Sequence, residues 1–200
     1  MVNLVFTIYR KLLKNLAFII YHYKFMNYCS NCGEKVSFGH IEVDPLPRFY
    51  CTHCGEIHYQ NPRVIIGCLP IWEDKVMLCK RGIEPQFGLW NLPGGFMENG
   101  ENTETGALRE VFEETGAHVR ILHLHSVYSV VPVNQVHLHY LAAMSDLNYQ
   151  LTPESTDIQM FAEAEIPWRD IAFTSNLFAL KKYFEHRKNN PTAVHSGAYH

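Results

Sequence analysis

The chain has 200 residues, of which 47% are hydrophobic. This length and composition predict one ordinary globular domain with a sizeable core, and they leave room for a small additional module. Seventeen lysine and arginine residues nearly balance 20 aspartate and glutamate residues. The molecule as a whole therefore lacks the strong positive field that attracts nucleic acid or an anionic membrane, and neither is expected as a partner.

The six cysteines do not indicate a disulfide framework. Four of them form two Cys-x-x-Cys pairs, which is the spacing of metal ligands. The other two, Cys68 and Cys79, lie in apolar segments where a small buried residue is expected. No cleavable secretory signal is recognised at the N-terminus. A reducing compartment, and hence a cytoplasmic protein, is the expectation.

Residues 1–25 are rich in large apolar side chains. Arg10, Lys11 and Lys14 divide them into runs well short of the roughly 18 apolar residues of a membrane-spanning helix, so no span is predicted. The interleaved basic residues fit an amphipathic helix lying in a membrane interface. The alternative is an N-terminal extension outside the working protein, because Met26 stands three residues before the first cysteine of the metal-type pairs. We favour this second interpretation.

Residues 26–61 are predicted to form a zinc ribbon. Two Cys-x-x-Cys-Gly knuckles are separated by 18 residues, and four thiolates complete a tetrahedral zinc site without an open position. The site is therefore expected to be structural, with zinc supplying on the order of 10 kcal/mol toward folding. The nearby His53 and His58 are not expected to be ligands. The predicted zinc ligands are Cys29, Cys32, Cys51 and Cys54.

Zinc ribbons also bind nucleic acid, which gives an alternative role for this module. Its Lys35 and Arg48 are outnumbered by Glu34, Glu42 and Asp44. The basic patch that nucleic-acid binding requires is missing. A role in packing, or in forming a homodimer, is the expectation.

Residues 62–188 are predicted to form a second domain that combines strands and helices. Strand-like runs at 64–71 and 75–80 flank a turn at 72–74, which indicates a β-hairpin, and a loop follows at 81–91. Two regular helices are expected, at 103–115 and 176–188. Further strands are expected at 121–131 and 135–144, with a loop at 151–163 that runs into a short strand. The tail at 189–200 is rich in Asn, Gly and His and is predicted to be disordered.

The helix at 103–115 follows a Pro-Gly-Gly break. Asn102 is expected to cap its N-terminus, and Gly116 is expected to end it. Gly106 is expected to weaken the helix by up to about 1 kcal/mol relative to alanine. At roughly 100° per residue, the apolar residues share one face and three glutamates lie on the opposite side. The expected apolar face consists of Ala107, Leu108, Val111, Phe112 and Thr115.

The three glutamates of this helix are Glu110, Glu113 and Glu114. Carboxylates at this spacing repel one another, and the helix dipole disfavours negative charge near the C-terminus. A cation relieves both effects, and oxygen ligands suit hard ions such as magnesium, which also binds phosphates. The usual explanation of a charge run is a solvated helix face. That explanation does not account for the Gly-Gly loop at this distance before the helix.

The segment 95–117, GFMENGENTETGALREVFEETGA, closely resembles the signature of the Nudix hydrolase superfamily. Gly95, Glu101, the Arg109-Glu110 pair, the Glu113-Glu114 pair and Gly116 fill every fixed position. The resemblance implies an α/β/α sandwich in which the segment forms a loop, a helix and a second loop. It also implies a hydrolase that cleaves nucleoside diphosphates linked to another group.

The resemblance also implies roles for individual residues. Glu113 and Glu114 would be metal ligands, as would the Gly94 carbonyl, and Glu110 would be a further ligand or the base that activates water. Arg109 and Glu101 would form a salt bridge that holds the loop against the helix.

A second acidic cluster lies in the segment PESTD, at 153–157. Several Nudix enzymes carry a glutamate in this loop as a base or an extra ligand, and Glu154 is the residue favoured for that role. An exposed loop acid is nearly as good an explanation of Glu154. Glu98, in the variable part of the signature, is a weaker candidate that would only touch the metal shell.

Beyond the signature, roughly 28–185 resembles the zinc-ribbon Nudix group that includes the plant chloroplast FAD pyrophosphatase and bacterial relatives. The resemblance rests on the segments CTHCGEIHYQNPRVIIGCL, VMLCKRGIEP, GLWNLPGG and PESTDIQMFAEAEIPW. It implies FAD or ADP-ribose as substrate and AMP as one product. NADH is the second choice, because the Ser-Gln-Pro-Trp-Pro-Phe-Pro signature of the NADH pyrophosphatases is absent.

Recognition of such a substrate requires aromatic residues that stack on adenine. The candidates are equally well explained as core aromatics. Two histidine pairs, His123 with His125 and His137 with His139, alternate along strands, so each pair shares one sheet face. A solvent-facing strand is favoured for them over an active-site wall. The aromatic candidates are Phe87, Trp90, Tyr128 and Tyr140.

Two functions without catalysis stay open besides the pyrophosphatase. A Nudix-fold regulator would bind a nucleotide without cleaving it, but regulators typically lose carboxylates of the signature and this chain keeps all of them. A nucleic-acid-binding zinc-ribbon protein would need a basic patch, which the sequence does not show.

Overall fold

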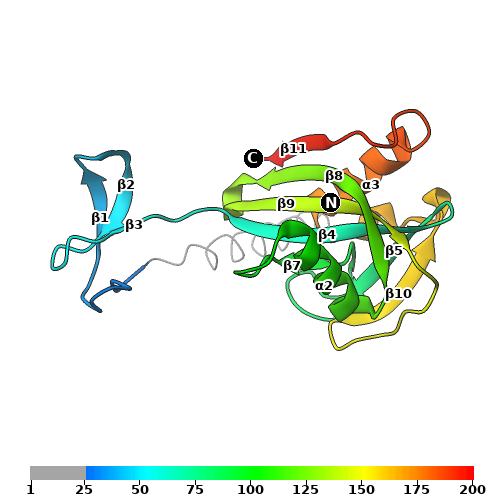
Figure 1. The fold of residues 1–200 in the computed structure, drawn as a ribbon, viewed down its shortest axis with the longest axis horizontal. Helices are drawn as coiled ribbons and strands as arrows, with labels where there is room; N and C mark the ends of the chain where they lie inside the picture. The colour runs from blue at the N-terminus through cyan, green and yellow to red at the C-terminus, as the bar shows by residue number, and fades with distance from the viewer. Residues whose placement is uncertain (1–25) are drawn as a thin grey trace, which may run out of the picture. The chain divides into compact units, whose positions relative to one another are not determined.

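The structure is a computed structural model that describes residues 26–200. The predictions made for residues 1–25 therefore lie outside the described residues. The chain divides into two compact units with a boundary between Asn61 and Pro62, and each unit has its own sheet (Figure 1). Within residues 26–200, no helix combines the length and the apolar character needed to cross a membrane.

The first unit is a small antiparallel sheet with two metal-type knuckles. Its strands are β1 (Ser37–Ile41), β2 (Asp44–Tyr50) and β3 (Ile57–His58), in the order β1-β2-β3. One knuckle precedes β1 and the other lies between β2 and β3. Side-chain packing between the strands is limited, with the rings of Phe38 and Phe49 4.8 Å apart. A module this thin depends on its knuckles for stability.

The second unit is built on an eight-stranded mixed sheet. The strand order is β10-β5-β4-β9-β8-β11, with β6 paired to β5 and β7 paired to β4. Two of the pairings, β4 with β9 and β8 with β11, are parallel. The predicted hairpin at 64–71 and 75–80 is confirmed as β4 and β5. The strands are β4 (Arg63–Trp72), β5 (Lys75–Arg81), β6 (Trp90–Asn91), β7 (Gly94–Phe96), β8 (Val119–Val130), β9 (Gln135–Met144), β10 (Ser155–Phe161) and β11 (His195–Tyr199).

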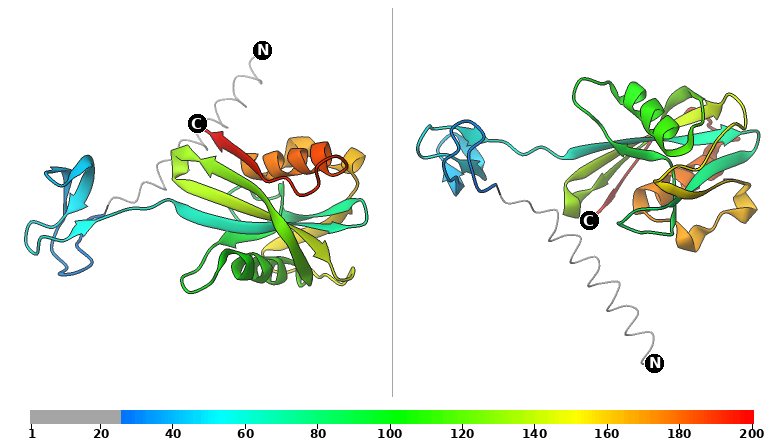
Figure 2. Two further views of the ribbon diagram at one scale, coloured as in Figure 1. Left: turned by 45° about the horizontal axis from the view of Figure 1, so that its top comes forward. Right: turned by 90° about the horizontal axis from the view of Figure 1, so that it is seen from below.

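Two helices cover opposite faces of this sheet, α2 (Thr103–Thr115) and α3 (Thr174–His186), as Figure 2 shows. Each closes its own hydrophobic core, one that includes Ala107 and Val111 of α2 and one that includes Ala179 and Leu180 of α3. The predicted α/β/α sandwich is thereby confirmed. Three short 3-10 helices complete the described part of the chain, η1 (Val131–Val133), η2 (Glu163–Glu165) and η3 (Trp168–Asp170).

Both ends of α2 are where the sequence predicted them. The Asn102 side chain accepts a hydrogen bond from the Thr105 backbone N–H at 2.8 Å. At the other end, Gly116 adopts φ 66 and donates its N–H to the Phe112 carbonyl. Helix α3 begins and ends two residues before the predicted range of 176–188.

The buried face of α2 differs from the predicted one. Leu108 and Phe112 are 36% and 52% exposed, whereas Glu110 and Glu114 are 9% and 7% exposed. The reason is that the side of α2 that contacts the sheet is centred on Ala107 and on the residues one turn away from it. Leu108 and Phe112 therefore lie outside this contact. The ring of Phe112 packs instead on that of His118, with centroids 5.1 Å apart.

The prediction of a disordered tail at 189–200 is wrong for its last residues. Strand β11 pairs parallel with β8, from His195 opposite Ser126 to Tyr199 opposite Val130. Gly197 permits this approach, because a Cβ there would lie 2.9 Å from the Phe178 ring. The tail thus covers what would otherwise be the open edge of β8.

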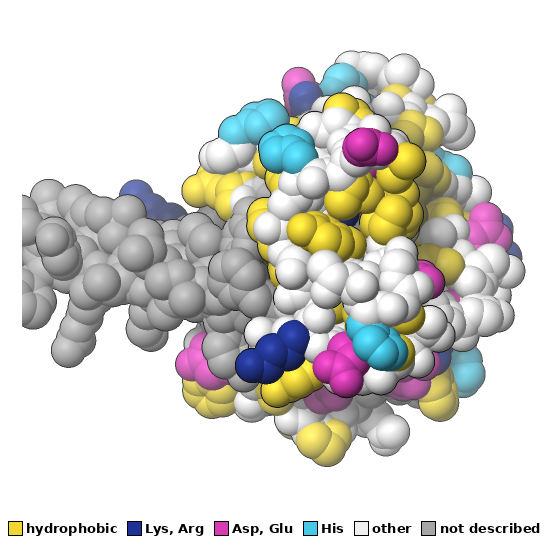
Figure 3. Space-filling view, turned by 90° about the vertical axis from the view of Figure 1, so that its left-hand side faces the viewer, with side chains coloured by type: hydrophobic (Ala, Val, Ile, Leu, Met, Phe, Trp, Pro, Cys, Tyr) yellow, Lys and Arg dark blue, Asp and Glu magenta, His cyan; other side chains and the backbone are white. Residues whose placement is uncertain are grey.

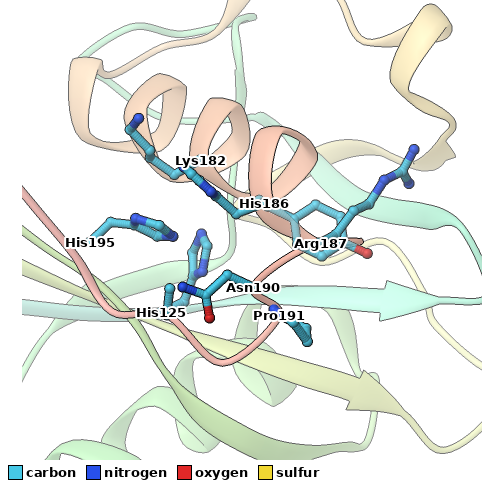
Figure 4. Close-up of a pocket in the computed structure, with 9 residues that line it drawn as sticks. His125, Lys182, His186, Arg187, Asn190, Pro191 and His195 are labelled. Carbon is cyan, nitrogen blue, oxygen red and sulfur yellow. The ribbon is translucent and has the colours of Figure 1, made fainter.

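The histidine at the start of β11 joins two others. The ring of His195 stacks on that of His186 at 4.7 Å and meets His125 edge-on at 5.3 Å. Figure 4 shows these three rings pointing toward one another, while Lys182 and Arg187 of the same pocket point away. The rings form a small polar contact between α3, β8 and β11.

The prediction of a solvent-facing strand is also wrong for three of the four paired histidines. His125, His137 and His139 are 3%, 8% and 4% exposed because α3 covers this part of the sheet. Hydrogen bonds satisfy their rings. These join His125 Nε2 to the Ala179 carbonyl (2.9 Å), His137 Nδ1 to Ser175 Oγ (2.9 Å), and His139 to Asn176 Oδ1 (3.0 Å) and Ser126 Oγ (3.1 Å).

Candidate active site

The buried glutamates of α2 lie against the backbone of β7. A Cβ on Gly95 would fall 2.5 Å from Glu110 Oε2, so only a glycine leaves room for this carboxylate. The Gly94 N–H donates to Glu114 Oε2 at 3.3 Å. Gly94 itself packs on Gly67 of β4, where a Cβ would lie 2.7 Å from the Gly67 Cα. The Gly-Gly step therefore brings the backbone of β7 into close contact with the two buried carboxylates.

Burial, together with the charge of neighbouring carboxylates, makes Glu110 and Glu114 hard to ionise. Burial, followed by the charge of Glu110, raises the pKa of Glu114 to about 8, although the Gly94 N–H and Arg81 oppose the shift. Burial also raises the pKa of Glu110, against the effect of the Arg109 guanidinium. The last turn of α2 contains no basic residue that would compensate. A bound cation is the natural counter-charge for such a pair.

Arg109 organises the acidic side of the helix. Its guanidinium forms a two-pronged ion pair with Glu101, through Nε at 3.1 Å and Nη2 at 2.9 Å. Nη1 contacts Glu110 at 2.8 Å and Glu113 at 2.9 Å, and Nη2 also donates to the Phe96 carbonyl. The salt bridge expected between Arg109 and Glu101 is thus present, and it ties the loop at 96–101 to the helix.

The three glutamates expected to converge do so only in part. Glu110 and Glu114 are both buried against β7, whereas the Glu113 side chain is 56% exposed and turns to Arg109. A helix step of 100° from Glu114 carries Glu113 toward solvent. Binding a cation with all three would require Glu113 to exchange Arg109 for the ion. Glu98 is exposed, and its backbone N–H donates to Glu101 Oε1.

Two residues from other elements act electrostatically on this pocket. The charge of Glu154, an exposed residue of the loop before β10, contributes to raising the pKa values of Glu110 and Glu114. Arg81, at the end of β5, lowers the pKa of Glu114. Its guanidinium lies over the Phe173 ring and donates to the Pro85 carbonyl, and within residues 26–200 it forms no salt bridge.

Nothing in the sequence singles out Arg81 as a site residue. Its only signal is a basic residue at the end of an apolar strand, and this pattern is too common to indicate a site.

The four cysteines of the knuckles meet as predicted. Their sulfur atoms all lie within 4.8 Å of one another, with Cys29 and Cys54 3.6 Å apart and Cys32 and Cys51 3.5 Å apart. Zinc–sulfur bonds of about 2.3 Å in a tetrahedron place the sulfurs roughly 3.8 Å apart, so the donor set fits zinc. Within residues 26–200, this is the one group of three or more Cys, His, Asp or Glu side chains that is so close.

The two knuckles have the same backbone geometry. In each, the glycine donates to the carbonyl of the first cysteine at 2.9 Å, and its φ is 78° at Gly33 and 79° at Gly55. Such positive φ values are strained for residues with a side chain. The repeated turn explains why a glycine follows each Cys-x-x-Cys pair.

Comparison with known protein families agrees with this geometry. A family model described as "NUDIX domain" matches residues 61–186, which is more than half of the chain. The chain belongs to the Nudix family. A second model, described as "Nudix N-terminal" and concerning a zinc ribbon, matches residues 27–60.

Among solved structures, a Nudix hydrolase from Nitrosomonas europaea is similar over 87% of this chain and 99% of that chain. The two are 47% identical, with a TM-score of 0.84. This likeness extends the Nudix assignment to most of both units.

Two curated relatives match over shorter segments. The NAD-capped RNA hydrolase NudC of Haemophilus influenzae is 34% identical over 97 residues, which are 48% of this chain and 35% of the relative. An ADP-ribose pyrophosphatase of Methanocaldococcus jannaschii is 39% identical over 71 residues, 36% of this chain and 42% of the relative. The chain thus matches less than half the length of each. The shared part supports a hydrolase of the Nudix family.

The four aromatic residues considered for substrate stacking do not form one surface of the Nudix domain. Trp90, Tyr128 and Tyr140 are each no more than 8% exposed. Trp90 and Tyr140 belong to the two different cores, and Tyr128 packs on Phe178 of α3. These three are therefore core residues, which was the alternative explanation. Phe87 is 59% exposed in the loop after β5 and stays a candidate.

Proposed function

We propose that this Nudix hydrolase is a magnesium-dependent pyrophosphatase that cleaves the diphosphate bond of FAD or ADP-ribose and releases AMP. The observation that carries the proposal is the pair Glu110 and Glu114, buried together against the Gly94–Gly95 backbone. Two buried carboxylates in this position are hard to ionise together, and a divalent cation would be their counter-charge. Hard divalent ions accept such oxygen ligands and bind phosphates at the same time.

In this proposal Glu110, Glu114 and the Gly94 carbonyl would hold the cation, and Glu113 would be a further ligand if it released Arg109. A bound divalent cation supplies charge neutralisation at the diphosphate and makes a coordinated water more acidic. Arg109 keeps its ion pair with Glu101, so the loop stays fixed on the helix when Glu113 moves. Arg81 lowers the pKa of Glu114 and forms no salt bridge among the described residues, so its guanidinium is suited to contact a phosphate.

The chemical step is the addition of water to one phosphorus atom. Glu154, or alternatively Glu110, accepts a proton from the attacking water, whose oxygen becomes bonded to phosphorus. The bond between that phosphorus and the bridging oxygen breaks, and the bridging oxygen remains on the other phosphate. Two monophosphates result, which for an adenosine diphosphate derivative include AMP.

The substrate class is supported by relatives and by one absent motif. One relative is named an ADP-ribose pyrophosphatase, and FAD follows from the resemblance of four segments to the zinc-ribbon Nudix group. NADH or another dinucleotide is the second candidate, because another relative is named an NAD-capped RNA hydrolase. The segment from the end of β8 into β9 reads VVPVNQVHLHY and lacks the Ser-Gln-Pro-Trp-Pro-Phe-Pro signature of the NADH pyrophosphatases, which favours the first candidate.

The surface of the zinc ribbon supports packing or homodimer formation rather than nucleic-acid binding. Arg48 is engaged by Asp44 through contacts of 2.8 and 3.3 Å. Figure 3 shows hydrophobic side chains gathered on the face in view, with Lys and Arg few and isolated. Large apolar residues of the ribbon are exposed by 57% to 76%: Tyr28, Phe38, Val43, Leu46 and Tyr59.

A hydrolysis panel tests the proposed function. Purified protein is incubated with FAD, ADP-ribose, NADH, NAD-capped RNA, diadenosine polyphosphates and nucleoside triphosphates, with magnesium or with a chelator, and products are separated chromatographically. AMP release from FAD or ADP-ribose that requires magnesium is expected, with at least a 100-fold loss in Glu110→Gln. Binding of these nucleotides without cleavage of any panel member would contradict the proposal and indicate a regulator.

A further inference from the structure

The loop between β9 and β10 caps the end of the helix that carries the buried glutamates. The last four carbonyls of a helix have no partner within it. In α2, the Thr152 hydroxyl donates to the Glu114 carbonyl at 3.1 Å, and the Gln150 N–H donates to the Thr115 carbonyl at 2.8 Å. Hydrogen bonds from the loop to the backbone carbonyls of Glu114 and Thr115 therefore hold the loop to the C-terminal turn of α2.

The hydroxyl of Thr152 makes a second contact, with the residue proposed as general base. Its Oγ1 accepts the backbone N–H of Glu154 at 3.3 Å while it donates to Glu114. A hydroxyl can do both at once because it has one proton and two lone pairs. One oxygen atom thus connects the backbone of Glu114 to the backbone of Glu154.

The other side of Glu154 is also fixed. Its carbonyl accepts the Gly82 N–H at 2.8 Å. A Cβ on Gly82 would lie 3.0 Å from the Pro153 carbonyl oxygen and 3.2 Å from that of Glu154, so a side chain there would press on the loop. Gly82, the residue after β5, and helix α2 therefore hold the backbone of Glu154 between them.

This arrangement matters because the Glu154 side chain is exposed and stands just before a strand, where it has no packing of its own. A base must stay within hydrogen-bond reach of its water, and a displacement of about 1 Å can reduce a rate by about 100-fold. Fixing the backbone on both sides restricts where the carboxylate can go.

We infer that Thr152 is a positioning residue, whose hydroxyl holds Glu154 in register with the cation-binding carboxylates of α2. The inference rests on the proposed function, because it gives Glu154 a role in catalysis. It adds a residue from outside the Nudix signature, and it couples the two acidic parts of the site through the backbone.

The test compares Thr152→Val, which keeps the shape and removes both hydrogen bonds, with Thr152→Ser, which keeps the hydroxyl. Steady-state kinetics with the best substrate of the panel and saturating magnesium should show kcat reduced 10- to 100-fold in Thr152→Val, with KM changed less than threefold. Thr152→Ser should restore kcat to within about threefold of the parent.

Thr156→Val is the matched control, because its hydroxyl also donates to a backbone carbonyl, that of Lys80 at 3.3 Å, but on the strand rather than at the loop. It should leave kcat unchanged. Urea unfolding of each variant accounts for any unfolded fraction. A Thr152→Val loss that matches the unfolded fraction, or an equal loss in Thr156→Val, would overturn the inference.

A double variant separates positioning from an independent effect. If Thr152 acts through Glu154, adding Thr152→Val to Glu154→Gln should reduce kcat no further, whereas losses that multiply would contradict this. Full activity in Glu154→Gln would also overturn the inference, since nothing would be left to position. The proposed function would survive that result if magnesium-dependent cleavage is present and is lost in Glu110→Gln.

Discussion

The two faces of the Nudix sheet each bury ionisable side chains under a helix of 13 residues, but they treat them differently. Beneath α3, the rings of His125, His137 and His139 are buried and hydrogen-bonded. Beneath α2, Glu110 and Glu114 are equally buried and face each other. The rings of the first group are neutral and hydrogen-bonded. In the second group Glu110 is paired with Arg109, whereas Glu114 forms no ion pair within residues 26–200 and accepts the Gly94 N–H.

The direction of the pKa shifts expresses the same difference. Burial lowers the pKa of His125 and of His137 to about 4 and that of His139 to about 3, so neutral rings are the stable form near neutrality. Burial raises the pKa of Glu114 to about 8, so its working, ionised form is the unfavourable one without a cation. A buried group whose hydrogen bonds are satisfied thus stabilises the fold, whereas a buried group that lacks a partner marks a binding site.

The largest expected effect follows from replacing Glu114 by glutamine. Glu114→Gln should reduce kcat by about 1,000-fold with saturating magnesium, because it removes a charged ligand from the cation site. The same change should leave the metal-free protein equally stable or more stable, since it removes a buried carboxylate that resists ionisation. Steady-state kinetics with magnesium and urea unfolding without added magnesium measure the two effects. Full turnover in this variant would contradict the proposal that Glu114 is a ligand of the cation.

On the other face, the expected effect is on stability and not on turnover. His139→Leu should lower the free energy of unfolding by about 2–4 kcal/mol, because Ser126 and Asn176 lose a buried partner. The kcat of the folded fraction should stay within about twofold of the parent. Urea unfolding and kinetics on the same preparation test both statements. A 100-fold loss of kcat in a fully folded variant would place His139 in the site after all.

The two faces should also give opposite dependences of stability on pH. The three histidines have lowered pKa values, so their contribution is complete above about pH 6.5 and is lost as the pH falls toward 4. Glu114 has a raised pKa, so its contribution is complete below about pH 4.5 and is lost as the pH rises toward 8.

Each group contributes at most about 1.4 kcal/mol per pH unit, and between about pH 5 and 6.5 the histidines outnumber the glutamates. The free energy of unfolding of the metal-free protein should therefore rise with pH in this interval. It should rise more steeply in Glu114→Gln, which keeps only the opposing group at Glu110. Urea titrations at several pH values measure the slope, and equal slopes in the two proteins would contradict the raised pKa of Glu114.

Local patterns in the sequence predicted where the helix and the sulfur cluster lie, but not which side chains face the sheet. The signature and the caps located α2 to the residue, and the knuckle spacing located the sulfur cluster, because both depend on neighbours in the chain. The exposure of Phe112, the burial of His139 and the pairing of β11 with β8 depend on contacts between segments far apart in sequence. A helical wheel gives the angle between residues, but it does not say which angle meets the sheet.

The smallest expected effect concerns Gly106, where the contact with the sheet again decides what the local pattern cannot. Helix propensity alone predicts that Gly106→Ala stabilises α2 by up to about 1 kcal/mol. In the structure, Gly106 is buried, and a Cβ would clash with the Ile66 side chain and the Glu101 carboxylate. Overpacking of this kind costs about 1–3 kcal/mol.

Gly106→Ala should therefore lower the free energy of unfolding, as measured by urea unfolding. It should also lose kcat, because displacing Glu101 loosens its ion pair with Arg109 and thereby the loop that faces the buried carboxylates. Gly39→Ala is a suitable control, since its nearest contact would be 3.9 Å away in the ribbon. A stabilised Gly106→Ala protein would show that the sheet can move to make room for a methyl group. The tight contact on this face would then not be what holds the carboxylates together.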